Sequence, residues 1–196
     1  MNYFEVFGLP RRLGIDLAEL QRRFYEQARR DHPDYHHGAG ADEQTRALEA
    51  SALLNAAYRT LRDPISRVEY LVRVEEGRDT RQGAGDKPKA PPALLAEMFE
   101  IQEALQEASA GGLDASGRAE LAAQRDRLRE RRHAEEERLR GPLSQAWDEG
   151  PAAERPQLLA SFKEALAARA YLRTVIQDLD EALGEGQEGY VAHHRH

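Results

Sequence analysis

The most regular feature of the sequence is a long apolar stripe near its carboxyl end. Within residues 157–184, seven positions follow alternating steps of three and four residues, and all of them are apolar except Arg169. These positions are 162, 165, 169, 172, 176, 179 and 183. Such spacing places side chains on one face of an α-helix. A helix this long with a single apolar face needs partner helices to cover it, so the stripe favours a helical bundle.

Two further helical stretches precede this one and complete the expected bundle. The first spans about 91–109 and the second about 115–140, where charged residues are abundant. The Gly141-Pro142 pair should break or kink the second stretch. We expect Trp147 beyond it to anchor the core rather than to bind a ligand. The sequence therefore predicts a three-helix bundle over residues 91–184, with a disordered tail at 185–196.

The amino-terminal part predicts a separate, smaller helical domain over residues 1–76. Helices are expected at about 17–31, 42–62 and 64–76. The grounds are apolar spacing, a cap at Asp16 three residues before Glu19, and the helix-start pair Asp63-Pro64. The residues expected to face its core are Leu17, Leu20, Phe24, Ala28, Ala47, Leu54, Tyr58, Leu61, Val68, Leu71 and Val72. Residues 77–90 are polar and contain glycine and proline without periodicity, which is typical of a linker.

Composition excludes several classes of function. The chain has no cysteine, so disulfides, thiol nucleophiles and thiolate metal ligands are excluded. Its formal net charge of −7 opposes general binding to nucleic acid. No apolar run approaches the roughly 20 residues that span a bilayer, and no leader segment is evident. We expect a cytoplasmic protein without cofactor, metal, nucleic-acid partner or membrane.

A loop with a histidine and a carboxylate is the strongest functional candidate. His32, Pro33 and Asp34 lie between two amphipathic helices, and the preceding helix carries two parallel rows of arginines. The rows are Arg22 with Arg29 and Arg23 with Arg30. A cationic face beside such a loop would suit docking on an acidic protein surface. Taken alone, the triplet could be an ordinary turn, and the arginines could be a solvated helix face.

Several of these segments together resemble the J domain of the HscB-type co-chaperones of iron–sulphur cluster assembly. The resemblance lies in residues 2–10, the basic helix, the His32-Pro33-Asp34 triplet, and residues 55–61 and 62–71. Residues 92–103 are similar to the first C-terminal helix of the family, and Trp147-Asp148 and Tyr171-Leu172 also fall in expected places. Tyr35 is a departure, because a lysine usually follows the triplet in J domains.

The resemblance implies an all-α, non-enzymatic co-chaperone with two partners. The J domain, a helical hairpin with a His-Pro-Asp loop, would stimulate a DnaK-type (HscA-like) chaperone ATPase. The residues implied are His32, Pro33, Asp34, Arg22, Arg23, Arg29 and Arg30. The C-terminal bundle would hold the IscU-type scaffold that carries the nascent cluster. The residues implied there are Leu95, Ala96, Phe99, Glu100, Glu103, Glu107 and Tyr171.

The residues of the 91–109 helix support a binding patch independently of the family. Leu94, Met98, Ile101 and Leu105 form one core stripe, so Leu95 and Phe99 exceed what one packing face needs. They are flanked by acids, as binding patches often are by polar residues. The alternatives are that Leu95 and Phe99 pack between domains, and that Tyr171 belongs to the core.

Two other functions stay open from the sequence. One is a general J-domain co-chaperone for unfolded protein clients. The other is an adaptor with a degenerate J domain that no longer activates any ATPase. Tyr35 is the residue that leaves this alternative open. A denatured substrate compared with a cluster scaffold would separate the first from the HscB-type reading. A gain in ATPase stimulation by Tyr35→Lys would test the second.

Overall fold

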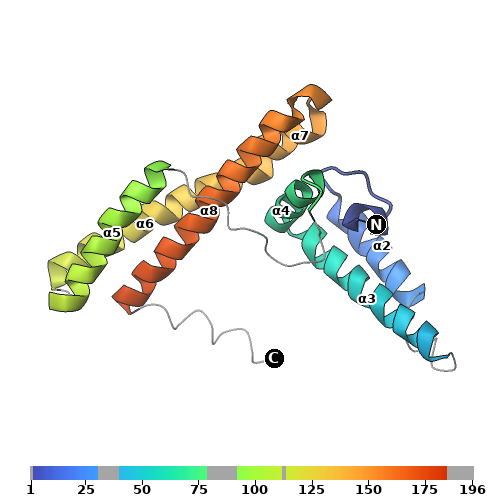
Figure 1. Ribbon diagram of the computed structural model, residues 1–196, viewed down its shortest axis with the longest axis horizontal. Helices are drawn as coiled ribbons and strands as arrows, with labels where there is room; N and C mark the ends of the chain where they lie inside the picture. The colour runs from blue at the N-terminus through green and yellow to red at the C-terminus, as the bar shows by residue number, and fades with distance from the viewer. Residues whose placement is uncertain (1, 31–39, 79–91, 112–113, 185–196) are drawn as a thin grey trace. The chain divides into compact units, whose positions relative to one another are not determined.

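The structure, a computed structural model, describes residues 2–30, 40–78, 92–111 and 114–184. All of its regular elements in these ranges are helices, and none of the described residues forms a strand (Figure 1). The α-helices are α1 (Tyr3–Val6), α2 (Leu17–Arg30), α3 (Ala41–Arg62), α4 (Pro64–Glu75), α5 (Pro92–Gly111), α6 (Ala115–Arg138), α7 (Ser144–Glu149) and α8 (Arg155–Leu183). The predicted all-α class is confirmed. None of the helices described is long and apolar enough to span a membrane.

The chain forms two compact units, and one of them is discontinuous. Unit 1 comprises residues 1–85 together with 140–159, and unit 2 comprises 86–139 together with 160–196. The sequence-based division assigned all of residues 91–184 to the C-terminal part. The structure instead groups α7 and the start of α8 with the amino-terminal helices. The predicted linker and tail lie almost wholly outside the described residues.

Helices α2 and α3 form the hairpin at the centre of unit 1. The Phe24 and Tyr58 rings stack across it with centroids 4.3 Å apart, and Leu20 and Leu61 are completely buried. The predicted core residues of α3 and α4 are buried or half-buried. Leu17 is an exception, because it is 51% exposed at the first turn of α2. Its place at the helix end lets it leave the core face that the spacing predicted.

Helix caps explain where two of these helices begin. The Asp16 carboxylate accepts hydrogen bonds from the backbone N–H groups of Ala18 and Glu19, at 2.9 and 3.2 Å. The Asp63 carboxylate accepts from the N–H of Ser66 at 2.7 Å, and Pro64 occupies the first turn of α4. Each acid satisfies donors that the first helical turn leaves unpaired. The aspartate caps that the sequence predicted are therefore present.

A buried arginine connects three segments of unit 1. The Arg67 guanidinium donates to the carbonyl oxygens of Leu61, at 2.6 Å, and of Leu13. A longer contact of 3.5 Å reaches the carbonyl of Arg62. Burial lowers the pKa of Arg67 from its ordinary value, since a charged group loses hydration in the interior. Backbone carbonyls at the end of α3 and in the 9–16 loop replace that water.

Residues 140–159 join unit 1 through α7. Helix α6 runs into a wider π-helical turn, Leu139–Leu143, which accommodates Pro142 in place of the sharp break that the sequence allowed. Trp147 on α7 is buried, as predicted for a core anchor. The neighbouring Asp148 carboxylate accepts from the N–H groups of Leu13 and Gly14, at 2.8 and 2.6 Å. Thus α7 fixes the same loop that Arg67 holds from the other side.

Unit 2 packs parts of α5, α6 and α8 around an apolar core. That core contains Leu94, Ile101, Leu121, Leu128, Ala168, Leu172, Val175, Ile176, Leu179 and Leu183, with Met98, Leu105 and Tyr171 partly buried against it. The predicted stripe of α8 is confirmed. Arg169, its polar member, is half-buried and donates to Glu136 of α6 at 2.9 Å. The predicted stripe of α5 faces the core as well.

Candidate functional site

The loop that the sequence singled out is outside the described residues. His32, Pro33 and Asp34, together with Tyr35, lie between the end of α2 and the start of α3, where the structure gives no placement. Their role stays a prediction. What the structure does describe is the helix that leads to the loop, with all four of the arginines predicted to support docking.

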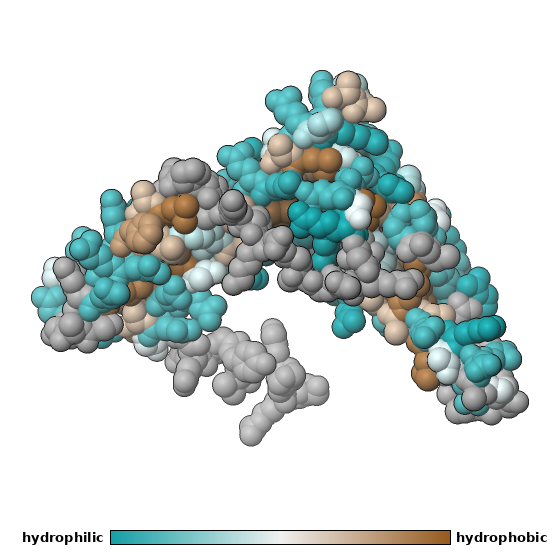
Figure 2. Space-filling model, in the orientation of Figure 1, coloured by the Kyte–Doolittle hydropathy of each residue, from teal (hydrophilic) through white to brown (hydrophobic). Residues whose placement is uncertain are grey.

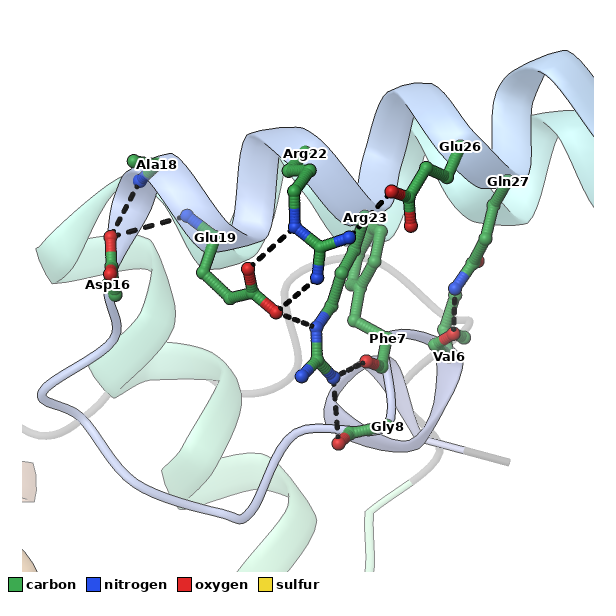
Figure 3. A network of polar contacts seen from close by, with 10 residues as sticks. All are labelled: Val6, Phe7, Gly8, Asp16, Ala18, Glu19, Arg22, Arg23, Glu26 and Gln27. Atoms are coloured by element: carbon green, nitrogen blue, oxygen red, sulfur yellow. Dashed lines mark hydrogen bonds and ion pairs between the residues drawn. The ribbon is translucent and has the colours of Figure 1, made fainter.

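Arg22 belongs to a network of ion pairs along α2 (Figure 3). Its guanidinium donates to Glu19 one turn before it, at 2.7 and 2.8 Å, and to Glu26 one turn after it, at 2.5 Å. Hydrogen bonds from Arg22 and Arg23 lower the pKa of Glu19 from 4.5 to about 2. Hydrogen bonds to Glu19 and Glu26 raise the pKa of Arg22. The positive charge of Arg22 is therefore balanced by carboxylates of its own helix.

Arg23 points to a different part of unit 1. Its guanidinium donates to Glu19 at 2.7 Å and to the carbonyl oxygens of Phe7 and Gly8 at 2.6 and 3.1 Å (Figure 3). Gly8 has a φ of 59°, a backbone conformation that favours glycine. The end of α1 thus turns its carbonyls toward α2, and Arg23 connects the two segments. Its predicted role in docking stays a prediction, beside this structural one.

Arg29 and Arg30 occupy the last turn of α2 and are exposed. Cations at a helix C-terminus are favoured by the helix dipole. Within the described part of the chain, Arg29 makes no ion pair. Arg29 therefore contributes positive charge that no carboxylate of the described residues balances, close in sequence to the His-Pro-Asp loop.

Helix α5 carries an exposed apolar patch in unit 2. Leu95 is 38% exposed and Phe99 is 67% exposed, while Leu94 and Ile101 of the same helix are buried. Hydrophobic side chains gather over α5 on the face that Figure 2 shows. Ala96, Glu100 and Glu103 are exposed as well, whereas the side chain of Glu107 is outside the described residues. We call Leu95, Phe99 and the acids Glu100 and Glu103 the α5 patch.

Tyr171 has surroundings unlike those of the α5 patch. It is half-buried and lines a cavity of about 10 Å³ with residues of all three core helices. The other lining residues are Leu94, Glu97, Met98, Ile101, Leu128, Leu172 and Val175. Its hydroxyl is buried without a hydrogen-bond partner in the described structure. Burial and the charge of Glu97 raise the pKa of Tyr171. Much of the Tyr171 side chain therefore packs against the core, in line with the alternative that Tyr171 is a core residue.

We call the exposed side of α2 that carries Arg22 and Arg29 the α2 face. The sequence analysis did not single out one residue of this face. Tyr25 is 60% exposed and lies between Arg22 and Arg29 on the outer side of the helix. A large aromatic residue outside the core stripe and within a row of arginines was the available signal. Leu48 on α3 is also 60% exposed and was likewise not singled out.

The described part of the chain contains no group of three or more His, Cys, Asp or Glu side chains placed to hold a metal ion. The pairs and groups of histidines at 36–37 and 193–196 are outside that part.

Comparisons with known proteins bring these features together. A family model described as "HSCB C-terminal oligomerisation domain" matches residues 90–180. The co-chaperone protein HscB of Proteus mirabilis is 28% identical over 95% of this chain and 99% of its own length. Over nearly its whole length, the chain is therefore similar to an HscB co-chaperone. A Vibrio cholerae HscB homologue is 34% identical over 110 residues, which cover 56% of this chain and 63% of the homologue, less than two thirds of its length.

Solved HscB structures share the fold. The chaperone HscB from Vibrio cholerae superposes with a TM-score of 0.59, covering 92% of this chain and 96% of the other at 24% identity. Human HscB gives a TM-score of 0.58, covering 92% of this chain and 81% of the other at 21% identity. The HscB-type architecture of an N-terminal J domain followed by a helical C-terminal domain is therefore confirmed, while the residue roles within it stay predictions.

Proposed function

We propose that this protein is an HscB-type co-chaperone, which stimulates the ATPase of a DnaK-type (HscA-like) chaperone and delivers an IscU-type scaffold to it. The α2 face and the His32-Pro33-Asp34 loop bind the chaperone, and the α5 patch binds the scaffold. Delivery of the scaffold promotes transfer of its iron–sulphur cluster to acceptor proteins. The protein itself regulates its partner and carries out no reaction.

The observation that supports this proposal most directly is the presence of two exposed faces with opposite chemistry. In unit 1, Arg29 is exposed near the end of α2 and makes no ion pair with the described residues. In unit 2, two exposed apolar side chains are bordered by Glu100 and Glu103. One face suits an acidic protein surface, and the other suits an apolar surface with a basic border. A co-chaperone that holds two different proteins at once needs two such faces.

Magnitudes favour Phe99 as the main anchor for the scaffold. Complete burial of a phenylalanine side chain contributes roughly 1.5–3 kcal/mol before the entropy of association is counted. Phe99 is two-thirds exposed, so most of its surface is available to a partner. The exposed acids add mainly orientation and association rate, because charges at the border of an interface are screened by salt.

The test is a pair of variants that separate the two functions. His32→Gln should abolish ATPase stimulation and leave scaffold affinity unchanged, because the two faces are on different units. Phe99→Ala should weaken scaffold binding about tenfold and leave stimulation by the co-chaperone alone unchanged. Leu48→Ala is a matched control, since it truncates an equally exposed apolar residue in unit 1.

Two results would contradict the proposal. One is a His32→Gln variant that stimulates the ATPase as the wild type does. The other is binding of the wild-type protein to a denatured substrate as tightly as to the scaffold, which would favour the general J-domain alternative. Purified chaperone, purified scaffold and isothermal titration with a steady-state ATPase assay are sufficient for these measurements.

A further inference from the structure

Tyr25 is an aromatic side chain that unit 1 does not use for its core. It is 60% exposed, whereas its neighbour Phe24 stacks on Tyr58 with centroids 4.3 Å apart. Tyr25 touches Phe24 in a tilted arrangement, with centroids 5.5 Å apart. The ring is therefore supported at its base while most of its surface faces solvent. Exposed tyrosines supply a large contact area with few rotatable bonds, and they are enriched at binding hot spots.

Its position on α2 places Tyr25 among the arginines. Residues 18, 22, 25 and 29 follow steps of four, three and four, so they share the outer side of the helix. Arg22 and Arg29 are the neighbours of Tyr25, one turn before it and one turn after it. All three side chains are exposed. An apolar centre flanked by polar residues is the usual arrangement of a protein-binding patch.

Charge gives the part of this face around Arg22 and Arg23 only a weak attraction. Glu19 and Glu26 balance Arg22, and Arg23 donates to Glu19 and to the backbone of the α1 segment. Surface charges that already have partners gain little from a new one. Desolvation of an exposed aromatic ring does not depend on such compensation. The strongest contribution available on the outer side of α2 is therefore the Tyr25 ring.

We propose that Tyr25 is the apolar anchor of the chaperone-binding face. Its ring inserts into an apolar hollow on the chaperone ATPase, and carboxylates around that hollow pair with Arg29 and Arg22. This inference rests on the proposed function, because it names the residue and the partner chemistry for the same site. In this proposal, Tyr25 provides most of the affinity for the chaperone ATPase, and Arg29 provides most of the dependence of that affinity on salt.

The experiment measures the affinity of full-length variants for the HscA-like chaperone at low and high salt. Tyr25→Ala should raise the dissociation constant at least about tenfold, with its dependence on salt unchanged. Tyr25→Phe should stay within about threefold of the wild type, because the ring is retained. Arg29→Ala should reduce the salt dependence. Leu17→Ala, which truncates a half-exposed apolar residue two turns earlier on α2, is the control and should bind like the wild type.

Each result bears on the inference. Wild-type affinity for Tyr25→Ala, in a protein whose wild type stimulates the ATPase, overturns the role of Tyr25 and leaves the proposed function intact. A weakened Tyr25→Ala that also loses its salt dependence overturns the division of roles between Tyr25 and Arg29. If Leu17→Ala is weakened as much, the anchor is not specific to Tyr25. A wild type that neither binds nor stimulates the chaperone overturns the inference and the proposed function together. Circular dichroism of each variant verifies that α2 is intact.

Discussion

Each of the two units is stabilised internally by a different kind of contact. In unit 1, polar side chains reach backbone groups of segments far away in the sequence, as Arg67 does to Leu13 and Asp148 does to Leu13 and Gly14. Tyr70 adds another such link by accepting from the N–H of Tyr3 at 2.8 Å. Unit 2 has a continuous apolar core along long helices. Most of its described polar contacts between helices are ion pairs, beside a hydrogen bond from Arg118 to the carbonyl of Leu183 at 3.0 Å.

The difference follows from the lengths of the elements. A long helix satisfies its own backbone groups and needs only an apolar face to pack. The 9–16 loop of unit 1 leaves backbone donors and acceptors that other segments must satisfy, because an unpaired buried polar group is costly. Unit 1 should therefore be sensitive to loss of a few polar side chains, and unit 2 to loss of apolar volume.

The largest expected effect is in the core of unit 2. Leu179→Ala removes a completely buried side chain and should lower the free energy of unfolding by about 3.5 kcal/mol. Urea denaturation measures the loss, and hydrogen exchange should locate it in α6 and α8. A loss below about 1 kcal/mol would contradict the view that apolar volume holds this unit.

Arg67→Ala should have nearly as large an effect in unit 1. It leaves the carbonyls of Leu13 and Leu61 without their donor, at an expected cost of about 3 kcal/mol. The control is Arg59→Ala, an exposed position on α3 that should change stability by less than about 0.5 kcal/mol. Equal stability of the two variants would remove the contrast between the units.

Asp148→Ala tests whether α7 stabilises unit 1. The N–H groups of Leu13 and Gly14 lose their acceptor, and the expected loss is about 2 kcal/mol. Glu149→Ala, at the exposed next position, is the control. Amide exchange at Leu13 and Gly14 should accelerate in the first variant and stay unchanged in the second. Unchanged exchange in both would show that Arg67 alone holds the loop.

Tyr171→Phe is expected to stabilise unit 2. The Tyr171 hydroxyl is buried without a partner in the described structure, so an apolar ring of the same shape should add about 1 kcal/mol of stability. Thermal unfolding measures the change. A loss of stability would mean that the hydroxyl is satisfied in solution, by a water molecule in the cavity beside it.

The smallest effect is the pH dependence that Glu19 gives to unit 1. Its pKa is about 2 in the folded chain against an ordinary 4.5, so its ion pairs stabilise the fold above pH 4.5 and are lost as the pH falls toward 2. Glu19→Gln should therefore melt at a lower temperature than the wild type at pH 7, with the difference shrinking at pH 3. If the difference in melting temperature between the two proteins stayed constant with pH, the change in side-chain packing and not the lost charge would explain it.

Local pattern predicted much of this fold. Helix positions followed from apolar spacing, from the aspartates at 16 and 63, and from Pro64, because each acts within a few residues. The Asp148 contact could not be predicted, since it joins positions 135 residues apart and no periodicity reports such a pairing. The α-helix is interrupted near Gly141-Pro142 as expected, but spacing could not show that the interruption is a π-helical turn, which can absorb a proline that an α-helix cannot.

The candidate site was predicted in part. Sequence spacing showed that Leu95 and Phe99 fall outside the core stripe, and both are exposed. It could not show that Arg23 turns toward the α1 segment, because that depends on where the chain near Gly8 places its carbonyls. The spacing assigned Phe24 to the core and so left Tyr25 on the outer side of α2, but spacing does not show how far that ring is exposed.

The discontinuity of unit 1 has a consequence for protein synthesis. A ribosome releases residues 1–85 first, but the nascent chain still lacks Trp147 and Asp148, which unit 1 uses to close around the 9–16 loop. About sixty more residues must leave the exit tunnel before that closure can occur. The amino-terminal segment therefore completes its fold late. A fragment that ends at residue 76 corresponds to the nascent chain that lacks residues 140–159, and not to the complete unit 1.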